Sequence, residues 1–182
     1  VFWMATIAEI AIILAQLDAR SILSQFVISK LTLGGGLPTL HLTTQLAFGS
    51  ILAVAGALLR IQCYRALGKH FTFETGISRD HKLVTSGPYR YMRHPGYTGS
   101  AAVYFGLLCS CGSPGSWFME CLFKGSTAGA VLCLSFAAVR GLAVSGLLLR
   151  MSKEDEGLKN EFGKEWTAWA ARVPYVLIPY IY

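Results

Sequence analysis

The sequence contains few charged residues. Only 14% of its 182 residues are Asp, Glu, Lys or Arg, whereas 53% are hydrophobic. An ordinary soluble domain carries about a quarter charged residues, so the composition excludes that class. It also excludes an intrinsically disordered chain, because this much apolar surface has to be buried. The composition therefore indicates a small polytopic membrane protein.

Motifs for metal or nucleic-acid binding are also lacking. Cys109 and Cys111 have no His or Cys partners at zinc-site spacing, so no metal ligands are predicted. Seven basic and two acidic residues lie between Arg60 and Pro95, but no recognition motif accompanies them, so no nucleic-acid partner is expected. The cysteines are typical of small buried side chains, with a disulfide among Cys109, Cys111 and Cys121 as the alternative.

Long apolar runs are what the sequence does have. Residues 42–59 contain no charged side chain, and a run of this length nearly crosses the hydrocarbon core of a bilayer. We predict membrane helices over 42–60, 95–112 and 126–150. A further helix or helical hairpin is expected over 1–33. The prediction is an all-α membrane protein with about four to five membrane helices in a single domain, residues 1–182.

The last two predicted helices form a hairpin, which returns the chain to the side it left. The 60–95 loop and the 150–182 tail then lie on one side of the membrane, and the basic residues of the loop favour the cytosol. Apolar residues recur at helical spacing from Leu158 to Trp169, which predicts an amphipathic helix at the membrane surface. The loop and the tail are therefore expected to form a cytosolic cofactor pocket.

Side chains suited to chemistry gather around His94. Pro95 is well placed as the first residue of a helix, whose N-terminal N–H groups can receive a carboxylate. Tyr89 and Tyr97 supply aromatic faces, which can hold a cation such as a sulfonium. The residues alone leave an alternative open, in which Arg93 and His94 are interfacial residues beside an aromatic belt.

Ionisable and small residues inside the apolar runs give two further expectations. Glu9 and Arg140 are expected to form an ion pair. The alternatives are snorkelling of the charged side chain to the membrane surface, or a first segment that does not span. Gly96, Gly99 and Gly106 are expected to loosen helix packing beside the pocket. Ordinary small-residue packing is the alternative for these glycines.

Two sequence blocks resemble the signature of the isoprenylcysteine carboxyl methyltransferase family. The first reads LVTSGPY over 83–89 and RHPGYTG over 93–99. The second begins at Glu154-Asp155, continues through Phe162-Gly163 and Trp166, and closes with Arg172-Val173-Pro174. The order and separation of the blocks match the family, and the resemblance covers roughly residues 45–182.

The resemblance implies an integral membrane enzyme of the endoplasmic reticulum with its active site facing the cytosol. Such an enzyme transfers the methyl group of S-adenosyl-L-methionine to the carboxylate of a C-terminal prenylated cysteine, so a prenylated protein C-terminus is the implied partner. A phospholipid N-methyltransferase is the rival activity, because that related family shares the Arg-His-Pro-x-Tyr pattern. A non-catalytic helical membrane scaffold is the non-enzymatic alternative.

Residue roles are implied by the motif positions. The implied cofactor-binding residues are His81, Lys82, Leu83, Val84, Tyr89, His94, Pro95, Gly96, Tyr97 and Glu154. Arg93 and Arg150 are the implied catalytic residues, and Arg150 also contacts the substrate. Asp155 stands where the family usually has a second Glu. From the residues alone, Arg150 and Glu154 could instead be a solvated ion pair one helical turn apart.

Overall fold

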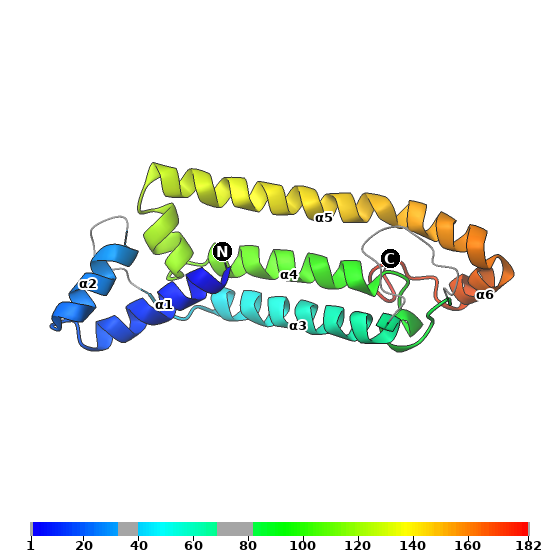
Figure 1. The fold of residues 1–182 in the computed structure, drawn as a ribbon, viewed down its shortest axis with the longest axis horizontal. Coiled ribbons are helices and arrows are strands. Elements are labelled where there is room, and N and C mark those ends of the chain that lie inside the picture. The colour runs from blue at the N-terminus through cyan, green and yellow to red at the C-terminus, as the bar shows by residue number, and fades with distance from the viewer. Residues whose placement is uncertain (1, 33–39, 69–81, 182) are drawn as a thin grey trace. The chain divides into compact units, whose positions relative to one another are not determined.

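The computed structural model describes residues 2–32, 40–68 and 82–181. Every regular element in these ranges is a helix and none is a strand (Figure 1), which confirms the all-α prediction. Two of the helices, α3 (Thr44–Leu67) and α5 (Thr127–Phe162), are long and apolar enough to cross a membrane. The chain divides into two compact units: unit 1 comprises Val1–Ile51 and Phe105–Arg140, and unit 2 comprises Leu52–Tyr104 and Gly141–Tyr182.

Unit 1 begins with two helices that pack against each other, α1 (Phe2–Leu17) and α2 (Ile22–Leu31). A short turn over 18–21 joins them, as expected for a helical hairpin. The side chain of Ile12 in α1 is fully buried. The indole N–H of Trp117 donates a hydrogen bond to the carbonyl of Leu31 at 3.0 Å, which ties the end of α2 to the segment after α4 (Pro95–Cys111).

Small and hydroxyl-bearing residues join the helix ends of unit 1. Helix α4 ends at Cys111 where Gly112-Ser113-Pro114 follows, and a π-helical segment, η3 (Phe118–Phe123), comes next. The hydroxyl groups of Thr43 and Ser113 share a hydrogen bond, as do those of Ser50 and Ser110 at 3.2 Å. Ser110 and Ser113 are buried, and a buried hydroxyl group needs such a partner because an unpaired polar group in an apolar setting is costly.

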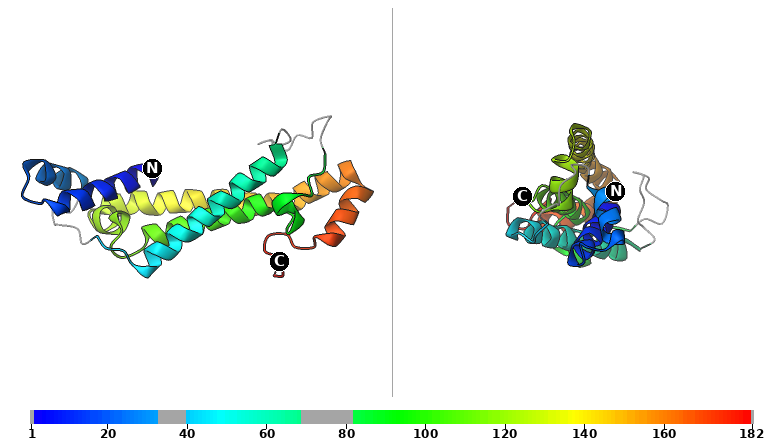
Figure 2. Two further views of the ribbon diagram at one scale, coloured as in Figure 1. Left: turned by 90° about the horizontal axis from the view of Figure 1, so that it is seen from below. Right: turned by 90° about the vertical axis from the view of Figure 1, so that its left-hand side faces the viewer.

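Unit 2 contains the end of α3, the beginning of α4, the later part of α5, a 3-10 turn η2 (Gly87–Arg90) and α6 (Lys164–Arg172). Helices α3 and α4 lie side by side (Figures 1 and 2). They approach closely where Gly56 faces Gly99. A Cβ atom built on Gly56 would lie 2.7 Å from the Gly99 carbonyl oxygen, so no larger residue fits there without a shift. This close contact holds α4 against α3 one turn after the start of α4.

Two helices run further than the charge pattern predicts. Helix α3 continues to Leu67 instead of ending near residue 60, and α5 continues to Phe162 instead of 150. Charged residues end the apolar run but not the helix, because Lys, Glu and Arg are good helix formers. The stop in α5 is Gly163, whose φ of +51° lies in a region that favours glycine. Helix α6 follows at once, so Leu158 and Trp166 lie on two helices.

The expected ion pair between Glu9 and Arg140 is wrong. Among the described residues, the guanidinium of Arg140 lies 5.6 Å from the ring centroid of Phe136, and no ion pair joins it to Glu9. The side chain of Arg140 is exposed, as a snorkelling arginine would be. The disulfide alternative is also wrong, because all five cysteines, each of them described, are free.

The expectation that glycines loosen the packing beside the pocket is also wrong for two of the three. A Cβ on Gly99 would lie 2.8 Å from the carbonyl oxygen of Gly56, and a Cβ on Gly49 would lie 2.6 Å from the carbonyl oxygen of Gly106. Small residues at such positions let helix backbones approach closely. Gly96 differs, since nothing lies within 4 Å of its Cβ position.

Candidate active site

The site lies in unit 2, at the start of α4. Gly87, with a φ of +61°, is the first residue of the short turn η2. Pro95 is the first residue of α4. Pro95 is fully buried and His94 is 8% exposed, so this corner is packed into the protein rather than displayed on its surface. The chain therefore enters α4 in a fixed direction, with Arg93 and His94 at the entry.

The two sequence blocks meet at this corner. The His94 Nε2 atom and Asp155 Oδ1 share a hydrogen bond of 3.0 Å, and Arg93 Nη1 lies 2.8 Å from the other oxygen of the same carboxylate. The Tyr97 hydroxyl donates to Glu154 Oε1 at 2.5 Å. The prediction that the His-Pro corner and the acidic segment of the tail lie together is thus confirmed.

The two arginines of the site have different surroundings. Arg93 has a side chain only 17% exposed, held by Asp155 and lying with its Cζ atom 5.9 Å from the ring centroid of Trp166. Arg150 has a side chain 43% exposed, with Nη2 at 3.3 Å from Glu154 Oε1. Arg93 is therefore committed to internal partners, whereas Arg150 keeps much of its guanidinium open to an incoming group.

A cluster of buried aromatic residues lies next to Arg93. Trp166, Trp169 and Val173 are buried, and partly buried apolar residues pack against them: Leu83, Tyr89, Leu158, Phe162 and Ala170. The indole N–H of Trp169 donates to the Tyr89 carbonyl at 3.3 Å. Burial raises the pKa of the Tyr89 phenol well above its usual range, and a hydrogen bond with the Cys63 thiol adds to the rise. Tyr89 is therefore neutral at physiological pH.

The segment after α6 crosses the entry of α4. The backbone N–H groups of Arg93 and His94 donate to the carbonyls of Tyr175 and Val176, each at 2.9 Å. These two N–H groups thus have backbone partners. Both groups precede α4, so the expectation that N–H groups of the helix N-terminus receive a carboxylate stays a prediction.

The remaining predicted residues are less central. Leu83 and Tyr89 belong to the aromatic cluster, whereas Lys82 is exposed and Val84 is half-buried. Neither Lys82 nor Val84 takes part in the hydrogen bonds or ion pairs that the described residues form around Arg93, His94 and Glu154. His81 lies outside the described residues. The sequence did not predict that the carbonyls of Tyr175 and Val176 bond to this corner, because every residue type carries a backbone carbonyl.

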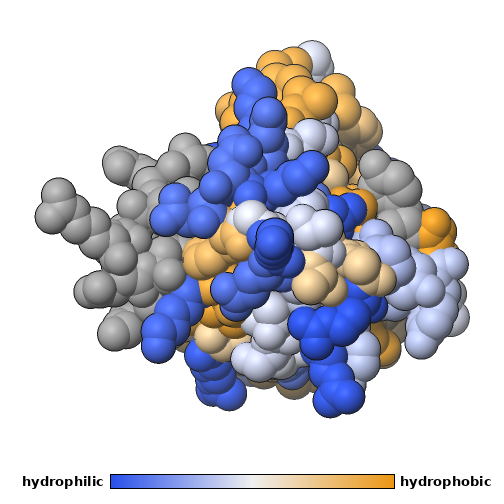
Figure 3. Space-filling view, turned by 90° about the vertical axis from the view of Figure 1, so that its right-hand side faces the viewer, coloured by the Kyte–Doolittle hydropathy of each residue, from blue (hydrophilic) through white to orange (hydrophobic). Residues whose placement is uncertain are grey.

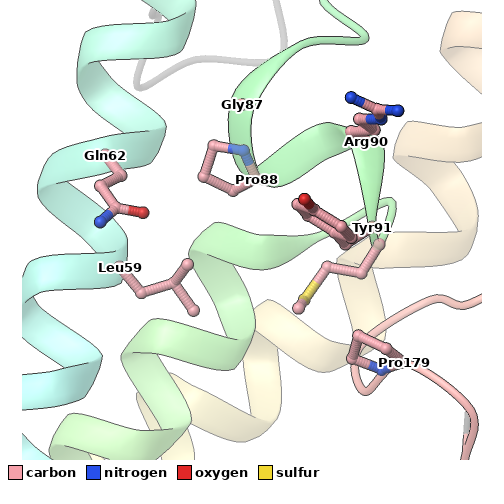
Figure 4. Close-up of a pocket in the computed structure, with 8 residues that line it drawn as sticks. Leu59, Gln62, Gly87, Pro88, Arg90, Tyr91 and Pro179 are labelled. Atoms are coloured by element: carbon pink, nitrogen blue, oxygen red, sulfur yellow. The ribbon is translucent and has the colours of Figure 1, made fainter.

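An apolar groove lies beside the site in unit 2. Its volume is about 560 Å³, and it is lined by Leu59, Gln62, Gly87, Pro88, Arg90, Tyr91, Met92 and Pro179 (Figure 4). Leu59 and Gln62 come from α3, and Pro88 and Tyr91 from the segment that leads into Arg93 (Figure 4). Hydrophilic residues gather on the end of the molecule formed by α6 and the last turns of α5 (Figure 3).

Known proteins share these blocks. The family model described as "Phospholipid methyltransferase" matches residues 44–133. "Protein-S-isoprenylcysteine O-methyltransferase B" of Arabidopsis thaliana is 33% identical over 129 residues, which cover 70% of this chain and 56% of the relative. Over most of its length the chain is therefore similar to an isoprenylcysteine O-methyltransferase. Two rice proteins, from Oryza sativa subsp. indica and subsp. japonica, both named "Probable protein-S-isoprenylcysteine O-methyltransferase", are 40% identical over 53 residues, 28% of either chain.

The similarity covers only part of the length of each of these relatives. The chain spans about 56% of the length of the Arabidopsis relative. A protein of Acanthamoeba polyphaga mimivirus named "Probable 7-dehydrocholesterol reductase" is also 27% identical over 113 residues, which cover 61% of this chain and 21% of that protein. No solved structure matches the chain. The activity therefore has to be argued from the site itself.

Proposed function

We propose that this protein methylates the C-terminal carboxylate of a prenylated cysteine, with S-adenosyl-L-methionine as the methyl donor. The observation that carries this proposal is the position of Arg150. Its side chain is 43% exposed and lies 3.3 Å from Glu154, which in turn accepts the hydroxyl hydrogen bond of Tyr97. A substrate-binding cation thus lies directly beside the residues proposed to hold the donor.

Arg150 suits a carboxylate substrate. A guanidinium presents a planar fork of N–H donors, which binds a carboxylate through two parallel hydrogen bonds. An α-carboxyl group has a pKa of about 3.5, so this nucleophile is ionised at neutral pH and needs no general base. The site then has to hold the carboxylate oxygen in line with the methyl carbon, and such alignment lowers the barrier by up to ~7–11 kcal/mol.

The donor site combines groups of both signs, as a zwitterionic ligand requires. Glu154 supplies a carboxylate that is 24% exposed, and the buried Nε of Arg93 has no hydrogen-bond partner among the described residues. Gly96 leaves open space at its Cβ position. We assign donor binding to these residues: His81, Lys82, Leu83, Val84, Tyr89, His94, Pro95, Gly96, Tyr97 and Glu154. When bound, S-adenosyl-L-methionine supplies an electrophilic methyl group.

Arg93 has a narrower role in this proposal. Its guanidinium contacts Asp155 and Trp166, so we assign it the role of holding the carboxylate of Asp155 in place. His94 shares a hydrogen bond with the same carboxylate, and its ring lies parallel to that of Tyr97 with centroids 5.4 Å apart. We therefore assign chemistry at the substrate to Arg150 and support of the donor to Arg93.

We place the site at the cytosolic face of the endoplasmic reticulum membrane, in a single membrane domain with four to five spans over residues 1–182. Its position at the start of α4 and the end of the apolar part of α5 supports an interfacial location. The apolar groove beside Met92 is suited to the hydrocarbon chain of a prenyl group. The volume of this groove falls within the ~300–1,000 Å³ of small-molecule sites. The tail of the substrate can then remain in lipid.

Methyl transfer in membranes tests the proposal. Membranes containing the protein are incubated with methyl-labelled S-adenosyl-L-methionine and a farnesylcysteine analogue, and base-labile label in the thioether product is counted. The proposal expects label with the wild type, a fall of at least ~100-fold in kcat/KM with Arg150→Ala, and wild-type activity with the exposed neighbour Lys153→Ala. Equal activity of Arg150→Ala and wild type contradicts the proposal.

Phospholipid N-methylation is the second candidate, favoured by the description of the matched family model. An amine acceptor has to lose a proton, and the hydrogen-bonded pair of His94 and Asp155 would be the base. Phosphatidylethanolamine in place of the farnesylcysteine analogue separates the two candidates. Base-stable label in lipid supports this second reading and contradicts the first.

A further inference from the structure

The C-terminal segment after α6 is bonded to the entry of α4 at three successive residues. The carbonyls of Tyr175 and Val176 accept from the backbone N–H groups of Arg93 and His94. The carbonyl of Leu177 accepts from the Thr98 hydroxyl at 2.6 Å. We call residues 175–177 the strap, because they cross the α4 entry and bond to it from outside its helix.

Thr98 is the side chain that anchors the strap. It lies one helical turn after His94 in α4, and its hydroxyl also lies 3.4 Å from the His94 carbonyl and 3.5 Å from the Met92 sulfur. The bond to Leu177 is the shortest of the three and links residues 79 positions apart. Of the three bonds that hold the strap at this entry, this one alone uses a side chain, so a single substitution can remove it.

We infer that Thr98, by anchoring the strap, positions Arg93 and His94 for binding of the methyl donor. The backbone N–H groups of these two residues are held by the strap, and their side chains are held by Asp155. Fixing both the backbone and the side chains leaves one orientation of the pair. Loss of the Thr98 bond frees Leu177 and loosens the strap. Arg93 and His94 then take up more than one orientation relative to Glu154. This inference rests on the proposed function only for the effect on the donor.

The strap also has a defined end. Ile181 N–H donates to the Ile178 carbonyl at 3.2 Å, with Pro179 and Tyr180 as the middle residues of the turn. The chain therefore reverses directly after Leu177, and the ring of Tyr180 lies 5.2 Å from that of Tyr175. The turn confines the strap to the three residues that bond to the α4 entry.

Thr98→Val tests the inference, because valine keeps the shape of threonine but cannot donate. Thr98→Ser retains the donor. Thr167→Val is the matched control: it makes the same substitution and removes an intrahelical hydroxyl bond, from Thr167 to the Gly163 carbonyl, on the exposed face of α6. All variants are compared with the wild type as the full chain in detergent or lipid nanodiscs.

Two measurements are made on each variant. Hydrogen exchange follows the backbone N–H groups of Arg93 and His94, and calorimetry follows the binding of S-adenosyl-L-methionine. Thr98→Val is expected to speed exchange at both groups and to raise the Kd of the donor, each by about tenfold, the factor that corresponds to loss of about one hydrogen bond. Thr98→Ser and Thr167→Val are expected to remain within about twofold of the wild type.

The outcomes separate this inference from the proposed function. Unchanged exchange in Thr98→Val overturns the anchoring role, whatever the donor does. Faster exchange with an unchanged Kd for the donor also overturns the inference, because the strap then has no effect on the site. If the wild type itself binds no donor, the proposed function fails, and the exchange data alone decide whether Thr98 anchors the strap.

Discussion

The His94 imidazole and the Asp155 carboxylate share a 3.0 Å hydrogen bond across 61 positions of the sequence. The same carboxylate lies 2.8 Å from Arg93 Nη1, so one acidic side chain from α5 holds two consecutive residues at the entry of α4. Its side chain is 16% exposed, which shields both interactions from solvent. The geometry of the site therefore depends on a residue that does not itself need to touch the substrate.

Asp155→Asn is expected to destabilise the protein by about 1–3 kcal/mol, because an amide cannot accept from both partners and leaves a largely buried Arg93 unpaired. Thermal unfolding in detergent measures the loss. Asp155→Glu retains the charge and is expected to lose less. An Asn variant as stable as the wild type would show that the carboxylate contributes nothing to this corner.

Arg150→Ala is expected to raise the KM for the prenyl substrate more than that for the methyl donor, and Glu154→Ala is expected to do the reverse. The reason is that Arg150 has the more exposed side chain, whereas Glu154 is bonded to Tyr97 within the proposed donor site. Steady-state kinetics with each substrate varied in turn gives both constants. Equal shifts from the two variants would argue against the division of roles.

Gly99→Ala is expected to cost about 1–3 kcal/mol, because its Cβ would lie 2.8 Å from the Gly56 carbonyl oxygen in the close contact of α3 and α4. Gly146→Ala is the matched control in α5, since nothing lies within 4 Å of that Cβ position. Unfolding midpoints in detergent measure both. Equal midpoints for the two variants would mean that the helices separate at no cost.

Tyr89→Phe is expected to reduce the loss of stability in alkaline solution. Burial raises the pKa of Tyr89 in the folded protein, whereas an unfolded chain releases this proton near pH 10. The folded state therefore binds more protons there, and the stability due to neutral Tyr89 is present below about pH 10 and is lost as the pH rises. Denaturation midpoints between about pH 8 and 11 measure this slope, with the exposed Tyr91→Phe as the control. Parallel slopes for Tyr89→Phe and wild type contradict the prediction.

The sequence predicted both ends of α4 because both carry strong local signals. Pro95 suits the first position of a helix, and Gly112-Ser113-Pro114 ends one, and the helix spans Pro95–Cys111. The meeting of the two blocks was also predictable, since two crossings return the chain to one side. The individual contacts at that meeting, His94 with Asp155 and Tyr97 with Glu154, were not predicted, because a motif does not say which of its side chains bond to one another.

Other features were not predictable, for physical reasons. Charge marks where an apolar run ends but not where a helix ends, so the extension of α5 to Phe162 was missed. The expected pair of Glu9 and Arg140 failed because composition gives no direction in which a side chain points from its helix. The bonds of the strap to Arg93 and His94 use backbone carbonyls, which every residue carries, so no residue type signals them.

The long sequence separation of the strap bonds affects how the protein is made. Thr98 leaves the ribosome 79 residues before Leu177, the residue that its hydroxyl binds. A nascent chain that ends after α4 thus carries Arg93 and His94 without the backbone carbonyls of residues 175–176 and the carboxylate of Asp155 that hold them. A chain that stops before residue 175 therefore lacks the partners of the Arg93 and His94 N–H groups, and this corner of the site is complete only once residues 175–177 have been made.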